Sequence, residues 1–225
     1  MLQSFVESRR GGESGIANVQ LLWGDEFEAA RQAGRWSQDL VDAAMNAETD
    51  MAAERQPRPR FEQPASAATP PPRPQPARPP KPHAICLTYE DGLKATVLAI
   101  GSDANRWNFA CRLRGRDQPL ATAIFNSPWG NRGLFKALSH AIQHTFRTGR
   151  EPYPAQRTML TTGAVEAVMR SFEQNGAVIE TPDLAVAYET PDWSAFRENG
   201  ETWKIITKDV PQPAGFEPRE VQPEL

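Results

Sequence analysis

The sequence predicts an α+β protein in which a mostly antiparallel β-sheet is backed by helices. Two observations predict this fold. Residues 83–100 hold two strand-like stretches, HAICLTYE and LKATVLAI, around Asp91-Gly92, a strong signal for a β-hairpin. Residues 133–148 and 155–174 instead repeat apolar side chains at helical spacing. With 225 residues, the chain can bury a substantial core.

The first segment, residues 1–54, is expected to form helix, strand and helix and to pack on the sheet domain. A short apolar face at Leu2, Phe5 and Val6 favours a helix that stops before Gly11-Gly12, and residues 16–22 suit a strand. Asp25 and Ser37 stand where the N-caps of two further helices would lie.

Residues 55–82 form a Pro-rich linker in this interpretation. The run TPPPRPQPARPPKP favours polyproline II, because proline fixes φ and supplies no amide donor. Arg73, Pro76 and Pro79 match an R-x-x-P-x-x-P ligand of SH3 domains. Such matches arise easily in any Pro/Arg-rich run, so a spacer or surface loop is preferred over peptide recognition.

Residues 83–190 are predicted to form the sheet and its helices. A two-residue turn would pair Leu87 with Thr96 and Ile85 with Leu98, which leaves both faces of the hairpin largely apolar. Two more strands of the same sheet are expected near 105–114 and 119–126, and short ones at 177–181 and 184–189. Gly163, inside a predicted helix, suggests a close approach to a neighbour. Residues 191–225 are expected to be a partly disordered C-terminal extension.

Composition disfavours several classes of function. A net charge of −3 and a pI near 5.7 argue against a nucleic-acid binder. The sequence has no run of 18 apolar residues that would span a membrane, and its start does not resemble a secretory signal. Cys86 and Cys111 are expected to be free thiols, so a cytoplasmic location is the default expectation.

No motif predicts a cofactor, a metal or a catalytic residue. The glycines around Glu13 lack the G-x-G-x-x-G spacing, and they follow a helix where a dinucleotide site would need a strand. His140 and His144 are one helical turn apart, a spacing that could hold a metal in a hydrolase, yet no H-E-x-x-H pattern accompanies them. Solvated histidines are therefore preferred. The arginines of 105–114 could bind an anionic substrate, although solvated charge is the preferred interpretation.

Several strings resemble the C-terminal half of the Gfo/Idh/MocA oxidoreductases, the glucose–fructose oxidoreductase and inositol dehydrogenase family, in a bacterial branch. They are LQSFVESRRGGESGIANVQ, GRWSQDLVDAA, ICLTYEDGLKATVL, TGREPYPAQRTMLTTGAVEAVMRS and IETPDLAVAYE, and together they cover most of 2–189 apart from the linker. The resemblance lies in their number and order, because no single string is a chemical motif.

The resemblance implies the substrate-binding and oligomerisation domain of an NAD(P)-dependent oxidoreductase. Family members bind NAD(P) in an N-terminal Rossmann domain and catalyse with the lysine of an E-K-P motif, and neither has a counterpart here. Whether the chain is an enzyme is thus left open: it is expected not to be catalytic on its own and to bind no cofactor, as either a gene fragment or a stand-alone subunit.

The resemblance also suggests ligands and partners. A sugar-like small molecule would contact Arg9, Arg10 and Glu13, because their loop follows the helix nearest the family's active site, although loop salt bridges are the preferred interpretation of each. A homo-oligomer would form through the open sheet face. The alternative is a non-catalytic interaction protein that uses the Pro-rich segment as a ligand and the sheet for dimerisation.

Overall fold

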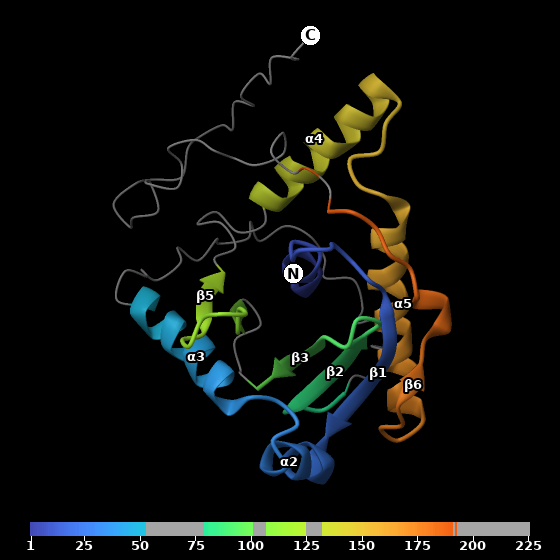
Figure 1. Cartoon of the computed structure of the whole chain (residues 1–225). Helices are drawn as coiled ribbons and strands as arrows, with labels where there is room; N and C mark the ends of the chain where they lie inside the picture. The colour runs from blue at the N-terminus through green and yellow to red at the C-terminus, as the bar shows by residue number, and fades with distance from the viewer. Residues whose placement is uncertain (53–78, 101–106, 125–131, 191, 193–225) are drawn as a thin grey trace, which may run out of the picture.

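The computed structural model describes residues 1–52, 79–100, 107–124, 132–190 and 192, and these form an α+β fold (Figure 1). Its helices are α1 (Leu2–Val6), α2 (Gly24–Gln32), α3 (Gln38–Ala52), α4 (Arg132–Thr148), α5 (Ala155–Glu173) and a 3₁₀ turn (Pro182–Leu184). Its strands are β1 (Ile16–Trp23), β2 (His83–Tyr89), β3 (Lys94–Ala99), β4 (Trp107–Cys111), β5 (Leu120–Ile124) and β6 (Ile179–Glu180). The Pro-rich run and residues 193–225 lie largely or wholly outside the described ranges.

The main sheet has the strand order β3-β2-β1-β6, and all its neighbouring strands are antiparallel. The predicted strand at 16–22 is thus a central member of the sheet, not part of a segment packed on it. Val19 and Leu21 alternate with less buried neighbours along β1 and are fully buried, the pattern of a strand with one strongly buried face.

The prediction that residues 105–114 and 119–126 extend this sheet was wrong. Both strands exist, but β4 and β5 pair only with each other in a separate two-stranded sheet. This hairpin packs on α3, and the Phe109 ring stacks on Phe5 of α1 with centroids 3.7 Å apart. A strand pattern predicts extended backbone, but it does not say which strand will accept the hydrogen bonds.

The predicted hairpin forms, but with a different turn and register. Its loop has three residues: Tyr89 N–H donates to Leu93 O at 2.9 Å, and Gly92 adopts φ +82, as in a turn closed by a left-handed glycine. Pairing therefore shifts by one residue, so that Leu87 faces Ala95 rather than Thr96.

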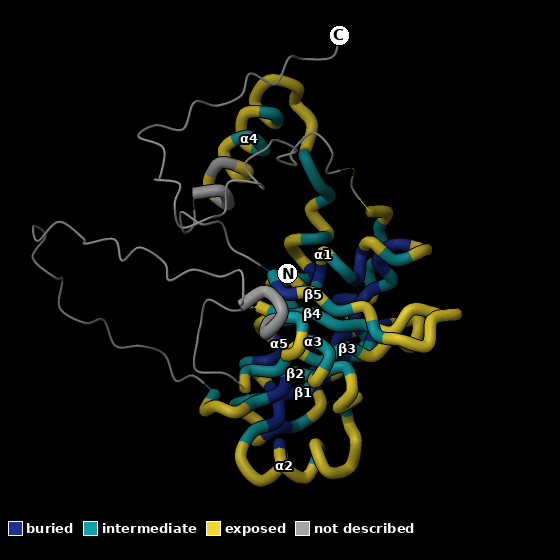
Figure 2. Tube along the Cα trace, turned by 90° about the vertical axis from the view of Figure 1, so that its left-hand side faces the viewer, coloured by how far each residue is buried: buried dark blue, intermediate teal, exposed yellow. Residues whose placement is uncertain are grey.

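The shifted register divides the two faces of the sheet unequally. One face is buried under α5, with Val19, Leu21 and Leu87 packed against Leu160. On the other face only the end near Ala84 is strongly apolar, and it is covered by Phe27 of α2. Towards the hairpin turn this second face carries Thr96 opposite Cys86, then Lys94 opposite Thr88. The prediction of two largely apolar faces is thus met only in part. Figure 2 shows the deeply buried residues concentrated around β1 and β2.

The two long predicted helices, at 133–148 and 155–174, are confirmed as α4 and α5. Gly163 of α5 makes the close approach that its position suggested, because a Cβ there would lie 2.5 Å from Leu184 Cδ2. The strand expected at 184–189 is absent from the described structure, where a single bridge joins Tyr188 to Glu13. Residues 184–186 instead cross closely over Gly15, where a Cβ would lie only 2.6 Å from Val186 N. In the described ranges, no helix is long and apolar enough to cross a membrane.

Candidate functional site

The most concentrated chemistry in the described structure is a buried polar cluster beside α1. We call it the Glu7 cluster. Its members are Gln3 and Glu7 in and just after α1, Glu13 in the following loop, Arg157 in the first turn of α5, and Tyr188 in the segment before Thr190. Glu7 and Glu13 are 0% and 1% exposed. Two acids buried this deeply require specific partners, because moving a carboxylate out of water is costly.

Arg157 and Tyr188 satisfy Glu7. Arg157 Nε lies 3.1 Å from Glu7 Oε1 and 3.0 Å from Oε2, and the Tyr188 hydroxyl donates to Oε2 at 2.6 Å. Arg157 also donates from Nη2 to Ser4 Oγ at 3.1 Å. The ion pair therefore fastens the end of α1 to the first turn of α5, and Tyr188 ties both to the last described segment.

Gln3 and the loop backbone satisfy Glu13. Gln3 Nε2 donates to Glu13 Oε2 at 2.6 Å and contacts the Tyr188 hydroxyl at 2.7 Å. Gly15 N–H donates to Glu13 Oε1 at 2.8 Å. The backbones of Glu13 and Tyr188 exchange two further hydrogen bonds, at 3.0 and 3.1 Å. Both carboxylates are thus engaged inside the protein, which defines the cluster as a structural clamp.

The tyrosines beside the acids are held in their protonated form. Burial, with the hydrogen bond to Glu7, raises the pKa of Tyr188 above its ordinary value. Burial, followed by the negative charge of Glu13, raises the pKa of Tyr89. A phenol with a raised pKa can donate a hydrogen bond, but it is a poor general base near neutral pH.

The structure does not bring the three predicted substrate contacts into one open site. Glu13 is occluded within the cluster and Arg10 is exposed. Arg9 forms an ion pair with Asp91 at 3.0 Å and donates to Ser14 Oγ at 2.8 Å. Its Nη1 is buried and has no hydrogen-bond partner among the described residues. Arg9 therefore forms the loop salt bridge that the sequence favoured, and a role for these residues in substrate binding stays a prediction.

Sequence reasoning missed Glu7, Arg157 and Tyr188. Arg157 lies 150 positions and Tyr188 lies 181 positions after Glu7 along the chain, so no local motif joins them. One signal was present in α1: Gln3 and Glu7 are four residues apart, and both lie next to the apolar face of Val6. Polar side chains at that spacing share one side of a helix, here the side that turns inward.

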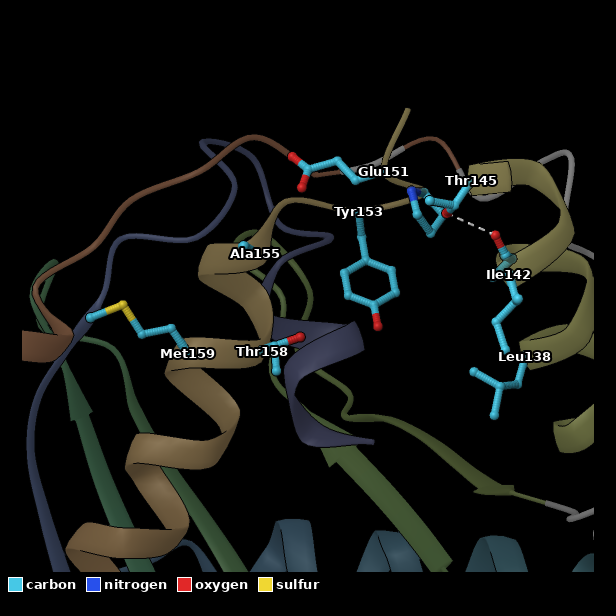
Figure 3. Close-up of a pocket in the computed structure, with 10 residues that line it drawn as sticks. Leu138, Ile142, Thr145, Glu151, Tyr153, Ala155, Thr158 and Met159 are labelled. Atoms are coloured by element: carbon cyan, nitrogen blue, oxygen red, sulfur yellow. Dashed lines mark hydrogen bonds between the residues drawn. The ribbon is translucent and has the colours of Figure 1, made fainter. Parts of the chain in front are cut away.

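A second feature is an open apolar groove of about 470 Å³ between α4 and α5. Figure 3 shows Leu138 and Ile142 of α4 on one side, Thr158 of α5 on the other, and the Tyr153 ring between them. Glu151 lies at the rim. The Tyr153 ring also lies 5.6 Å from the Arg157 guanidinium carbon, so one wall of the groove touches the Glu7 cluster.

The remaining nucleophiles and candidate ligands form no further site in the described ranges. Cys86 and Cys111 are both free thiols, as predicted, and burial raises the pKa of the Cys86 thiol, which disfavours the reactive thiolate. His140 and His144 are partly buried on α4, and the described residues bring together no group of three His, Cys, Asp or Glu that could hold a metal. Arg112, one of the strand arginines, pairs with Asp39.

Over the part of the chain that the structure describes, the fold and these features define an α+β protein with an internally saturated acidic cluster and an open apolar groove between α4 and α5. No family model, curated protein or solved structure matches the chain.

Proposed function

We propose that this chain is a substrate-binding and oligomerisation domain of an NAD(P)-dependent oxidoreductase of the Gfo/Idh/MocA type. It would contribute surface rather than catalytic groups. The absence of a catalytic role in this proposal rests on the Glu7 cluster, because both of its buried acids already bind partners inside the protein. The assignment to this type of oxidoreductase rests on the strings that resemble the family.

The loop after α1 is where a substrate would be contacted. Arg10 is exposed, and Arg9 beside it is held in place by Asp91 and Ser14. Guanidinium groups suit the hydroxyl and carboxylate oxygens of a sugar-like molecule. Glu13 would act indirectly, because its bond to the Gly15 amide holds the loop in shape.

For assembly, the resemblance implies the open sheet face, and the structure favours the part of the main sheet at the outer edge of β3. This strand is the last in the order β3-β2-β1-β6, so one of its edges has no partner strand in the described sheet. Val97 on β3 and Ile100 just after it are 40% and 46% exposed. An unpaired edge with exposed apolar side chains is suited to pairing with a second copy.

Light scattering and cofactor titration test this proposal. We expect the wild-type chain to be larger than a monomer and Val97→Lys to reduce it to a monomer, because lysine on an edge strand opposes pairing. Val165→Lys is the matched control, since Val165 is an exposed valine on α5, away from the β3 edge. NADH and NADPH fluorescence should show no saturable change. A monomeric wild type would contradict the assembly role, and tight dinucleotide binding would contradict the accessory role.

A further inference from the structure

Helix α4 carries an apolar stripe that the described residues leave open. Phe135, Leu138, Ile142 and Phe146 are 64%, 51%, 47% and 86% exposed, and they extend the α4–α5 groove along the helix. Figures 1 and 2 show α4 standing apart from the main sheet at one end of the molecule. Burying one such side chain is worth about 1.5–3 kcal/mol, so a cover for this stripe would be strongly stabilised.

The charges on α4 indicate which kind of segment would bind over its apolar stripe. The sequence of the helix, RGLFKALSHAIQHTFRT, contains three basic residues, two histidines and no acid. A segment that places apolar side chains on the stripe and acids near the helix would complement it in both respects.

The chain itself supplies such a segment immediately after its last described residue. Residues 193–206 read WSAFRENGETWKII. Five of them are large apolar residues, and between the first and last of these Glu198 and Glu201 are balanced by Arg197 and Lys204. The match to α4 therefore rests on the five apolar side chains, with the two acids as individual partners for its basic residues.

The described chain ends within reach of the groove. Thr190 Oγ1 donates to the Glu7 carbonyl oxygen, which holds this segment against the end of α1. Figure 1 shows the described stretch that ends at Thr190, coloured orange, running away from α2 into the half of the molecule that carries α4. An extended stretch of 14 residues spans up to about 45 Å, whereas α4, with 17 residues, is about 25 Å long.

We propose that residues 193–206 fold back along the α4–α5 groove and place their apolar side chains on the stripe of Phe135, Leu138, Ile142 and Phe146. A tethered segment has an effective concentration in the millimolar range, which favours it over a second copy at the same surface. This inference is independent of the proposed function, because neither the groove nor the tail belongs to the β3 edge or the loop after α1.

Cysteine crosslinking tests the contact directly. In a chain with Cys86→Ala and Cys111→Ala, the groove pair combines Ile142→Cys with Glu201→Cys. The control pair combines Val165→Cys with Glu201→Cys, because Val165 is exposed on α5 but does not line the groove. We expect the groove pair to form an intrachain disulfide at least tenfold faster than the control pair. Equal rates, or a product that is mainly a crosslinked dimer, would overturn the proposal, the second result in favour of another copy as the occupant.

Hydrogen exchange provides a second measurement that does not depend on added cysteines. The full-length variant Trp203→Ser, Ile205→Ser, Ile206→Ser should lose at least tenfold in amide protection over α4. Amides around the buried Leu160 of α5 should be unchanged. Unchanged protection of α4 would overturn the proposal, because the helix would then be insensitive to the segment said to cover it.

Discussion

Replacing Arg157 with methionine should destabilise the fold by about 3 kcal/mol, because it leaves the Glu7 carboxylate buried without its cation. Nε lies 3.0 and 3.1 Å from the two carboxylate oxygens. At an effective dielectric constant of 20 the Coulomb attraction at this distance is about 5 kcal/mol. Arg157 is 22% exposed, so solvent offsets part of that attraction. Removing one partner of a buried pair typically costs about 3–5 kcal/mol, and the lower end applies here.

A double-mutant cycle isolates the pair. Glu7→Gln alone should cost about 2 kcal/mol, since glutamine keeps a hydrogen-bond acceptor for Tyr188 but loses the charge. In the double variant the two losses should overlap, with a coupling energy of about 2 kcal/mol. Urea unfolding followed by circular dichroism measures all four free energies of unfolding.

The matched control is the pair of Arg31 and Glu28 on α2. Its atoms are just as close, at 2.9 Å, but the two side chains are 48% and 49% exposed. The same substitutions, Arg31→Met and Glu28→Gln, should therefore couple by less than about 0.5 kcal/mol. A coupling energy below about 0.5 kcal/mol for Glu7 and Arg157 would contradict the description of this pair as a clamp. It would also show that burial does not set the strength of the ion pair.

Two further predictions concern Tyr89 and the close glycines. Burial raises the pKa of Tyr89, so above about pH 10 the unfolded state releases this proton while the folded state retains it. The free energy of unfolding should then fall by about 1.4 kcal/mol per pH unit because of this group. Urea unfolding between about pH 9 and 11 should show a shallower fall in Tyr89→Phe. If wild type and variant lost stability equally with pH, a raised pKa of Tyr89 would be contradicted. Gly163→Ala should destabilise by about 1 kcal/mol, because overpacking against Leu184 exceeds the gain in helix propensity. In a Leu184→Ala background the same change should stabilise by about 1 kcal/mol, and thermal unfolding that shows no reversal of sign would refute the steric explanation. Gly15→Ala should be more damaging than Gly163→Ala, since φ is +94 and the close neighbours are backbone atoms that cannot rotate away.

Features set by neighbouring residues were predictable from the sequence. The helices α4 and α5 were predicted within a residue or so of their ends, because their apolar side chains repeat at helical spacing over many turns. The Asp91-Gly92 hairpin and the close approach at Gly163 were also predictable, since each depends on what glycine alone allows. Of the candidate site, the sequence pointed to the loop of Arg9 and Glu13 and to the possibility that its charges are paired internally.

Tertiary structure decided the features that depend on distant partners. One extra loop residue shifted the hairpin register, which made the second face of the sheet more polar than the sequence suggested. The pairing of β4 with β5 alone, and the central place of β1, followed from competition among strands with similar patterns. The Glu7 cluster joins the end of α1 to Arg157 and Tyr188, which lie 150 and 181 positions further along the chain. Its members have no shared motif because a hydrogen bond depends on distance in space, and only the folded chain sets that distance.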